Sequence, residues 1–245
     1  MTHRQTGRGA GNAIRVCCAR RALRRLALKI AEIFYSLQGE GSLLGVPSVF
    51  IRTSGCNLRC RWCDTPYTSW NPEGVEMTLE AIVEQASGYG ASYVVVTGGE
   101  PLIAAGIVEL TRRLKDAGFH ITIETAGTVY ADVVCDLMSI SPKLANSTPE
   151  GPFRAQHERL RLNLEVLAKL MLYPHQLKFV VTAPEDLEEI RRYPGEKKDV
   201  ILMAEGTRAE VLRERAVWLA EICKSEGYRF SPRLHVDLWG DRRGV

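Results

Sequence analysis

Three cysteines lie close together in one short segment of the chain. Cys56, Cys60 and Cys63 form a Cys-x3-Cys-x2-Cys pattern directly after the apolar run Pro47 to Thr53. Structural zinc usually takes two well-separated Cys-x2-Cys pairs, and the remaining cysteines of this chain form no second pair with that spacing. Three thiolates in one tight loop instead suit a cuboidal iron–sulfur cluster with one iron left open to a ligand. The pattern therefore predicts a catalytic cluster, with zinc or chance clustering as the alternative.

The next apolar run, Tyr93 to Thr97, also ends in a segment that can bind a ligand. It continues as Gly98-Gly99-Glu100-Pro101. Adjacent glycines leave room for a ligand to approach the backbone, and Glu100 can accept a hydrogen bond from an ammonium group. Such a turn is common by itself, but this one follows the cysteine loop at an interval of one strand and one helix. We therefore expect the two segments to form one site.

These segments must be positioned by an alternation of strands and helices. Six expected strands separated by helices predict an α/β fold with a parallel sheet, open or curled into a partial barrel. In such folds functional residues gather at the C-terminal ends of the strands. The expected strands cover residues 47–53, 93–97, 120–124, part of 133–140, 176–182 and 200–203, and the expected helices cover 78–85, 103–117, 160–172, 184–192 and 208–225, with a surface loop at 145–156.

Composition and charge limit the class of protein. The chain has 245 residues, of which 45% are hydrophobic and 25% charged, which excludes a disordered chain and a disulfide miniprotein. Up to Lys29 the chain carries eight basic residues and no acid, whereas the rest carries the other 24 of 32 basic residues and all 29 acidic ones, or −5. We therefore expect residues 1–28 to be a mobile basic extension and residues 29–245 the catalytic domain. The acidic body argues against a nucleic-acid-binding surface.

The sequence also indicates a compartment. No apolar run approaches the roughly 20 residues that span a membrane. Arginines interrupt the apolar stretches of the basic extension, so it has no signal-peptide h-region. The odd number of seven cysteines suits the reducing cytoplasm better than a disulfide framework. We therefore expect a cytoplasmic protein without a membrane partner.

The cysteine motif, with Trp62 before its last cysteine, resembles the signature of the radical S-adenosylmethionine superfamily, and the Gly-Gly-Glu turn strengthens the resemblance. This implies a partial (β/α)6-type parallel barrel, in which that turn meets the amino group of the cofactor's methionine. Residues 29 to 245 more closely resemble the 7-carboxy-7-deazaguanine synthase family. The motifs that carry this second resemblance are Ile33 to Ser42, Cys63-Asp64-Thr65, Glu124 to Thr128 and Ser141-Pro142-Lys143.

The resemblance implies a carbon–nitrogen lyase of queuosine or 7-deazapurine biosynthesis. Such an enzyme converts 6-carboxy-5,6,7,8-tetrahydropterin to 7-carboxy-7-deazaguanine with loss of ammonia, after a 5′-deoxyadenosyl radical has taken hydrogen from C6. The implied cofactors are a 4Fe-4S cluster, S-adenosylmethionine and Mg2+. The implied partners are the pterin substrate, a flavodoxin- or ferredoxin-type reductant and a second copy of the chain in a homodimer.

The resemblance also implies a role for each site residue. Arg52 would hold the substrate carboxylate, which a guanidinium fork fits bidentately, and the hydroxyl of Thr65 would be a hard oxygen ligand for magnesium. Glu40 and Glu124 would contact the ring or assist proton transfer. The other implied substrate contacts are Leu37, Gln38, Gly39, Thr97 and His235. The implied cofactor contacts are Trp62, Cys63, Asp64, Gly99, Glu100, Ser141, Pro142 and Lys143, and the cluster ligands are Cys56, Cys60 and Cys63.

Each of these residues also has an ordinary structural interpretation. Arg52 could form an ion pair, Thr65 could cap a helix, and Glu40, Glu124 and His235 could be hydrogen-bonded parts of the fold. Two segments depart from the family. The chain continues through Trp239 to Val245, where some members end in a proline that reaches the substrate. In addition, residues 202–205 lack a glutamine and a proline of some relatives.

Two other functions are compatible with parts of the pattern. A glycyl-radical-enzyme activase shares the compact Cys-x3-Cys-x2-Cys body, but it has no reason to carry Leu37, Gln38, Gly39 and Arg52 as grips for a small molecule. A zinc-stabilised nucleic-acid-binding module could use the basic extension. The acidic body and the missing fourth ligand argue against this module.

Overall fold

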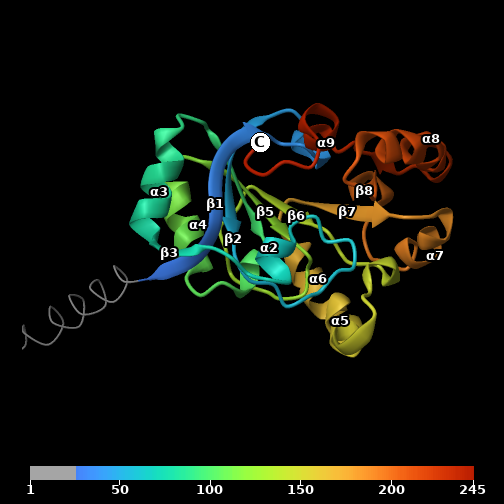
Figure 1. Ribbon diagram of the computed structural model, residues 1–245, viewed down its shortest axis with the longest axis horizontal. Helices are drawn as coiled ribbons and strands as arrows, with labels where there is room; N and C mark the ends of the chain where they lie inside the picture. Colours follow the sequence, from blue (N-terminus) through green and yellow to red (C-terminus); the bar gives the residue numbers. More distant parts are fainter. Residues whose placement is uncertain (1–25) are drawn as a thin grey trace, which may run out of the picture.

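Alternating apolar and polar residues build one mixed sheet, which the computed structural model describes over residues 26–245 (Figure 1). Within these residues nine strands pair in the order β3-β1-β2-β4-β5-β6-β7-β8-β9. The seven strands β2, β4, β5, β6, β7, β8 and β9 run parallel to one another, whereas β1 is antiparallel to both of its neighbours, β2 and β3. The strands are β1 (Ala27–Leu37), β2 (Pro47–Thr53), β3 (Val75–Thr78), β4 (Tyr93–Gly98), β5 (His120–Thr125), β6 (Leu137–Ile140), β7 (His175–Val181), β8 (Val200–Ala204) and β9 (Arg229–Phe230).

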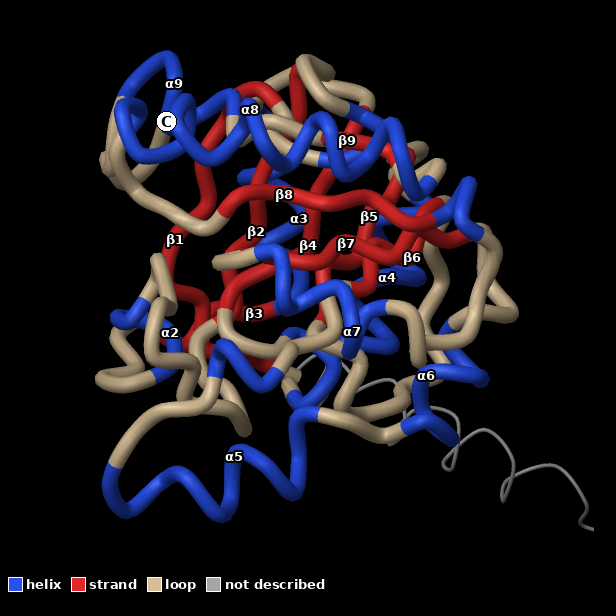
Figure 2. The backbone as a smooth tube through the Cα atoms, turned by 90° about the vertical axis from the view of Figure 1, so that its right-hand side faces the viewer, coloured by secondary structure: helices blue, strands red, loops and turns tan. Residues whose placement is uncertain are grey.

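Helices between the strands bury apolar residues against the sheet. Leu79 and Ile82 of α3, Leu110 of α4 and Leu219 of α8 have no exposed surface and belong to one core with the strands. Figure 2 shows α8 and α9 above the strands and α5 below them. In the described residues no helix has the length and apolar character that crossing a bilayer requires. The helices are α2 (Pro66–Ser69), α3 (Leu79–Gly88), α4 (Ile107–Asp116), α5 (Arg154–Arg161), α6 (Leu164–Leu170), α7 (Leu187–Ile190), α8 (Ala209–Glu226) and α9 (Leu234–Trp239).

The alternation along each strand decides which side chains reach the site. In β7, Leu177 and Phe179 belong to the core under the helices, while Lys178 between them lines a cavity on the opposite face. Successive side chains of a strand point to opposite faces of its sheet. Arg52 of β2 and Thr97 of β4 are register partners on the same cavity face. The strands thus carry polar residues inward without interrupting the core.

The predicted parallel sheet is confirmed. The six predicted strands correspond to β2, β4, β5, β6, β7 and β8, and they form an open sheet. The helix predicted over residues 78–85 is α3, and the Thr78 hydroxyl caps it by accepting a hydrogen bond from the Ala81 amide. The sequence patterns did not predict β1, β3, β9, α2 or α9.

Two expected segments were wrong in detail. The helix predicted over residues 160–172 is broken into α5 and α6, because Leu162 is extended and the Asn163 side chain caps the second helix by accepting from Val166 N. The segment predicted as a surface loop over residues 145–156 contains two 3-10 turns and the start of α5. Ser147 within it is fully buried.

The expected boundary between extension and catalytic domain falls inside a strand. Ala27 and Leu28 pair with Thr78 and Met77 of β3, and Leu28 is only 2% exposed in the core. Strand β1 therefore begins before Lys29, because its apolar side chains are needed to cover α3. Residues 1–25 of the expected extension lie outside the described residues.

This boundary leads to a test by truncation. A chain that begins at Leu26 is expected to keep the melting temperature of the full chain. A chain that begins at Lys29 is expected to lose about 3 kcal/mol of unfolding free energy, because it lacks the buried Leu28 side chain and its strand pairing. Denaturant unfolding of the two truncated chains measures the difference. Equal stability would contradict the role assigned to Leu28.

Candidate active site

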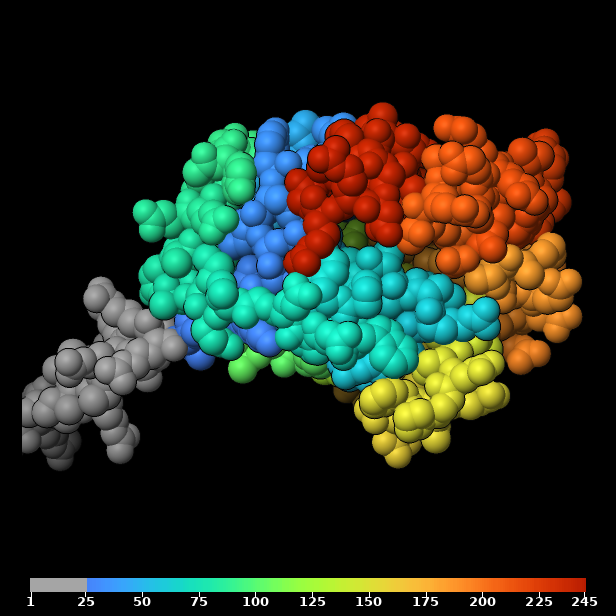
Figure 3. Space-filling model, in the orientation of Figure 1, coloured from blue at the N-terminus to red at the C-terminus, as the bar shows by residue number. Residues whose placement is uncertain are grey.

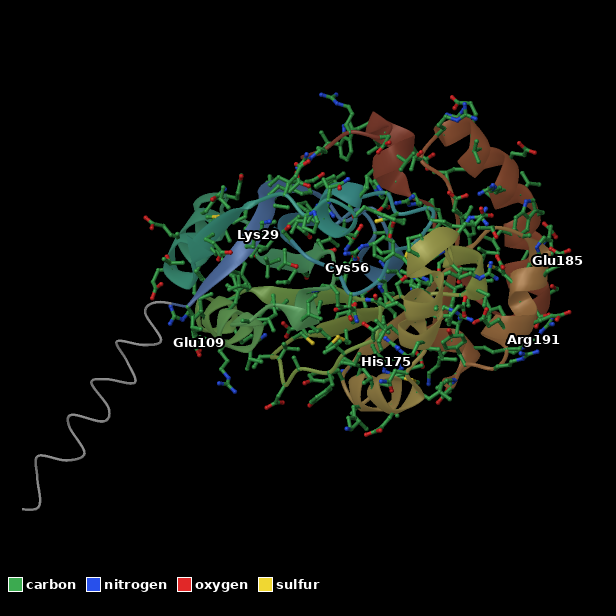
Figure 4. All side chains as sticks on the ribbon, turned by 60° about the horizontal axis from the view of Figure 1, so that its bottom comes forward. Lys29, Cys56, Glu109, His175, Glu185 and Arg191 are labelled. Atoms are coloured by element: carbon green, nitrogen blue, oxygen red, sulfur yellow. The ribbon has the colours of Figure 1, made fainter. Side chains whose placement is uncertain are left out.

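The carboxyl ends of the parallel strands open into a cavity of approximately 490 Å³. Its lining comes from the ends of β1, β2, β4, β5, β7 and β8, from the loops after them, and from residues 240–245. Figure 3 shows the C-terminal segment beside the residues that follow β2, across the mouth of a hollow. In Figure 4, Cys56 lies near the middle of the molecule, whereas Glu109, Glu185 and Arg191 lie at its periphery. The cavity has the size of a small-molecule site.

Cys56, Cys60 and Cys63 all line one end of this cavity. Their loop starts at Gly55, whose φ of +113° favours glycine and lets the chain turn away from β2. Gly55 N donates to Thr68 O at 2.8 Å, and Trp70 Nε1 donates to Cys60 O at 3.1 Å. Hydrogen bonds to α2 and to the side chain of its C-cap residue, Trp70, therefore hold the loop that carries the three thiols.

The chemistry of this thiol set fits a cluster. Burial raises the pKa of Cys56 to about 11 and that of Cys60 to about 12, so bound iron would have to stabilise their thiolates. In residues 26–245 no three His, Cys, Asp or Glu side chains converge on a point where they could hold a single metal ion. A cubane cluster does not require such convergence, because each thiolate binds a different iron.

The Gly98-Gly99 pair lies against the end of β2 and the start of the cysteine loop, where a side chain would collide with backbone. A Cβ on Gly98 would lie 2.1 Å from Thr53 O, and one on Gly99 would lie 2.0 Å from Gly55 O. Glu100 N also donates to Gly55 O at 2.9 Å. The lack of side chains lets the backbones pack this closely, and both glycines also line the cavity, so their contact with a ligand stays a prediction.

Glu100 is not among the residues that line the cavity, and its expected contact with an ammonium group stays a prediction. Its carboxylate is fully buried and accepts from Thr125 Oγ1 at 2.8 Å, Ala126 N at 2.9 Å and Leu102 N at 3.1 Å. Burial raises the pKa of Glu100. The residue ties the end of β4 to the end of β5.

The residues expected to bind S-adenosylmethionine gather at the cysteine end of the cavity. Lys143 Nζ lies 5.7 Å from the centroid of the Trp62 ring and donates to Ser141 Oγ at 2.8 Å. These three residues, together with Cys63, Asp64 and Gly99, line the cavity. Pro142 is the exception, because it is buried behind the wall and does not line the cavity.

A buried charge cluster forms the other end. Lys178, which is 2% exposed, places Nζ 2.9 Å from Glu40 Oε2 and 2.9 Å from Glu124 Oε1. Burial alone would lower the pKa of Lys178, but attraction to Glu124 and Glu40 outweighs it and raises that pKa above its ordinary value. Burial would likewise raise the pKa of Glu40, but Lys178 and Arg233 hold it well below its usual range. Both ions therefore stay charged at neutral pH.

Arg233 connects this cluster to the cysteine loop. Its Nε lies 3.0 Å from Glu40 Oε1, its NH1 donates to Gly206 O at 2.6 Å, and its NH2 pairs with Asp64. His235 lies beside it, with Nε2 3.5 Å from Arg233 NH2. Burial lowers the pKa of His235, which favours the neutral ring. One guanidinium thus links Glu40 of the charge cluster to Asp64 of the cysteine loop.

Leu37, Gln38 and Gly39 line the same end. Gln38 Nε2 donates to Glu124 Oε1 at 3.4 Å, and Thr97 Oγ1 donates to Glu124 Oε2 at 3.4 Å. Gly39 has to be glycine, because a Cβ there would lie 2.1 Å from Nδ1 of His235. The structure therefore brings the predicted polar contacts together around Glu124.

Arg52 enters the cavity beside two aromatic rings. Its Nε donates to Glu32 Oε1 at 2.7 Å, and Tyr67 OH donates to the same oxygen at 2.6 Å. The ion pair uses Nε alone, which leaves the two terminal amino groups of the guanidinium fork to a carboxylate ligand. Phe34 and Phe50 stack at 5.1 Å between ring centroids and line the adjacent wall.

Thr65 was also interpreted as a possible helix cap. It does occupy the N-cap position of α2, but its hydroxyl makes no cap hydrogen bond. Instead Oγ1 lies 3.8 Å from Cys63 Sγ, and Thr68 Oγ1 donates to it at 3.4 Å. Thr65 lines the cavity close to the cysteine loop. Its oxygen is therefore placed where a hard cation could use it.

Several lining residues were not predicted. Lys178 interrupts an apolar strand, and Phe34 lies in the segment Ile33 to Ser42. The alternation of side chains along a strand could have predicted that both face the cavity. Arg233 and the tail residues 240–245 carry no local signal, because only the return of the chain after α8 brings them to the cavity. Arg243 in this tail lies over the Tyr67 ring at 3.6 Å and pairs with Glu73 at 3.1 Å.

Comparison with known proteins agrees with this site. Residues 50–171 match the Radical SAM superfamily model. A 7-carboxy-7-deazaguanine synthase of Halobacterium salinarum is 46% identical, with 88% of this chain and 91% of the relative covered. One from Rhodopirellula baltica is 45% identical, with 89% of each chain covered. Among solved structures, this chain is similar to the crystal structure of QueE from Escherichia coli, with a TM-score of 0.66 and 26% sequence identity. The match covers 88% of this chain and 98% of that chain. This chain belongs to the 7-carboxy-7-deazaguanine synthase family of the radical SAM superfamily.

Proposed function

We propose that this chain converts 6-carboxy-5,6,7,8-tetrahydropterin to 7-carboxy-7-deazaguanine with loss of ammonia. The observation that carries the proposal is a single cavity with three thiols at one end and a ring of buried charges at the other. The thiol end suits a 4Fe-4S cluster and S-adenosylmethionine, and the charged end suits a flat, nitrogen-rich ring. When bound, the two cofactors supply the one-electron chemistry that starts the reaction.

The charged end would recognise the pterin ring. Glu124 presents carboxylate oxygens whose position is set by Lys178 and Thr97, so they can accept from ring N–H groups. The Gln38 amide can supply a donor and an acceptor to the same ring. Phe34 and Phe50 give the ring an aromatic wall. Glu40 is held by both Lys178 and Arg233, which makes it an orienting group in preference to a proton carrier.

Arg52 would bind the substrate carboxylate. Glu32 fixes the guanidinium through Nε and directs the two terminal amino groups into the cavity, where a carboxylate can accept from both. Thr65 would ligate Mg2+ from the cysteine side, with substrate and water oxygens in the remaining octahedral positions. The substrate would then be held at three points, which fixes the carbon that loses hydrogen relative to the cluster end.

The remaining partners follow from the same proposal. A reduced flavodoxin- or ferredoxin-type protein would supply the electron, and two copies of the chain would form a homodimer, as the family resemblance implies. We place the reaction in the reducing cytoplasm, where the cluster thiols stay free of disulfides. Among the described residues all five cysteines are free thiols.

Anaerobic turnover tests the proposal. The reconstituted full chain, given the carboxylated tetrahydropterin, S-adenosylmethionine, reductant and Mg2+, is expected to release 7-carboxy-7-deazaguanine, identified by its mass. Removal of Mg2+ is expected to lower the rate about tenfold or more, because the substrate loses one of its fixed points. Reductive cleavage of S-adenosylmethionine without any deazapurine product would contradict the proposed substrate. Formation of a glycyl radical on a partner protein would favour an activase instead.

A further inference from the structure

The outer side of the cysteine loop is held by a segment that takes no part in lining the cavity. Arg59 N donates to His157 Nδ1 at 3.2 Å, and Arg61 N donates to Ser147 O at 2.8 Å. Arg59 and Arg61 flank Cys60 in the sequence. The indole of Trp62, which precedes Cys63, donates to Asn146 O at 3.1 Å. Residues 146–157 therefore contact the neighbours of two cluster cysteines.

His157 is the most constrained member of this segment. It is 1% exposed and belongs to α5, and Ser147, on which it packs, is fully buried. Because Nδ1 accepts from Arg59 N, the ring proton must lie on Nε2, which is 2.9 Å from Ser147 Oγ. Ser147 Oγ in turn donates to Leu144 O at 2.6 Å. The chain of hydrogen bonds therefore has one direction and one tautomer.

This arrangement has no place in the proposed reaction. His157 does not line the cavity, and the cysteine loop separates it from any ligand there. Both ring nitrogens of this buried histidine are engaged in hydrogen bonds, one of them with an amide that lies between two cluster cysteines. The histidine is therefore placed to influence the shape of the loop. Residues behind metal ligands commonly set the orientation of those ligands, and their loss weakens metal binding.

We propose that His157 is a positioning residue that holds the cysteine loop in its cluster-binding shape through the Arg59 amide. It does so by offering one acceptor, Nδ1, at a fixed place on α5. The inference rests on the cluster of the radical SAM family and not on the identity of the substrate. A failure of the pterin assay therefore leaves it standing, and its own test does not use turnover.

Three substitutions separate the acceptor from the bulk of the ring. The Oδ1 atom of asparagine is as many bonds from Cα as Nδ1 of histidine, so His157→Asn keeps the acceptor for Arg59 N. The Nε2 amino group of glutamine instead stands near the histidine Nε2 position, so His157→Gln keeps the donor for Ser147 and loses the acceptor. His157→Ala loses both. His120→Ala, at the amino end of β5, is the control for loss of a partly buried histidine far from the loop.

Two measurements on the full chain decide the matter. After cluster loading, His157→Ala and His157→Gln are expected to lose iron to a chelator about tenfold faster than the unchanged chain. His157→Asn and His120→Ala are expected to stay within about twofold of it. Hydrogen exchange at the Arg59 amide should rise in the same two variants before loading, because that amide loses its acceptor.

Two outcomes would overturn the inference. If His157→Ala released iron at the unchanged rate, the histidine would not support the loop. If His157→Asn and His157→Gln released iron equally fast, the effect would come from packing of the ring and not from the acceptor. Melting temperatures of all variants, taken without the cluster, show whether α5 itself has been lost.

Discussion

A Cys60→Ala chain is expected to bind no 4Fe-4S cluster and to form no product. Cys60 is 8% exposed and lines the cavity, and its removal leaves a second iron of the cluster without a protein ligand. The loop backbone should persist, because Trp70 holds it through the Cys60 carbonyl and not through the thiol. Iron content and visible absorption after anaerobic reconstitution measure the loss, alongside turnover.

Cys223→Ala is the matched control. This thiol is 4% exposed in the core beneath α8, outside the cavity, so the same chemical change there should leave iron content and product unchanged. A modest loss of stability is expected from the smaller side chain. Full activity of the reconstituted Cys60→Ala chain would refute both the cluster and the radical mechanism.

Lys178→Met is expected to destabilise the fold by about 3–5 kcal/mol, because it leaves two buried carboxylates without their shared cation. Within the described residues Glu124 has one ion pair, with Lys178 at 2.9 Å, and it would lose that pair. Glu40 has two ion pairs and would lose the one with Lys178 but keep the one with Arg233. Binding of the substrate should also fail, since the oxygens that face its ring lose their fixed positions. Denaturant unfolding and substrate titration measure the two effects.

Two further variants test the cause. Lys169→Met removes a lysine from an exposed i,i+4 pair with Glu165 and should cost no more than about 0.5 kcal/mol. Adding Glu40→Gln and Glu124→Gln to Lys178→Met should restore much of the stability without restoring substrate binding. If the triple variant were as unstable as Lys178→Met, the loss would come from packing of the lysine stem and not from unpaired charge.

The sequence predicted the parallel part of the sheet well because buried strands have few alternatives. Runs such as Tyr93 to Thr97 and Gln176 to Thr182 are rich in β-branched residues and too short for buried helices. Strand β1 escaped prediction because its burial does not alternate cleanly and a register shift lies between Ile30 and Glu32. An irregular strand of this kind becomes visible only once its partners β2 and β3 are known.

The residues of the site likewise divide into those that the sequence predicted and those that it did not. The three cysteines, Gln38 and Arg52 were predicted from motifs within single segments, and all of them line one cavity. Lys178 and Arg233 were not predicted, because their partner Glu40 lies 138 and 193 residues away in the sequence. The hydrogen bonds that Glu100 accepts from Thr125 and Ala126 could not be predicted either, because a motif does not show which segments pack against it.

Gly98 and Gly99 lie against backbone at the end of β2 and the start of the cysteine loop, and this close packing limits how the site can change in evolution. At that end the glycines lie against backbone carbonyl oxygens, so a new side chain on either glycine would displace the neighbouring backbone. The opposite end is built from paired charges on separate segments, and the pairs that Lys178 forms with Glu40 and Glu124 include no residue of the cysteine loop. The generation of the radical and the choice of molecule it attacks are therefore under separate mutational control. New substrates can be acquired at the charged end while the radical chemistry is inherited intact.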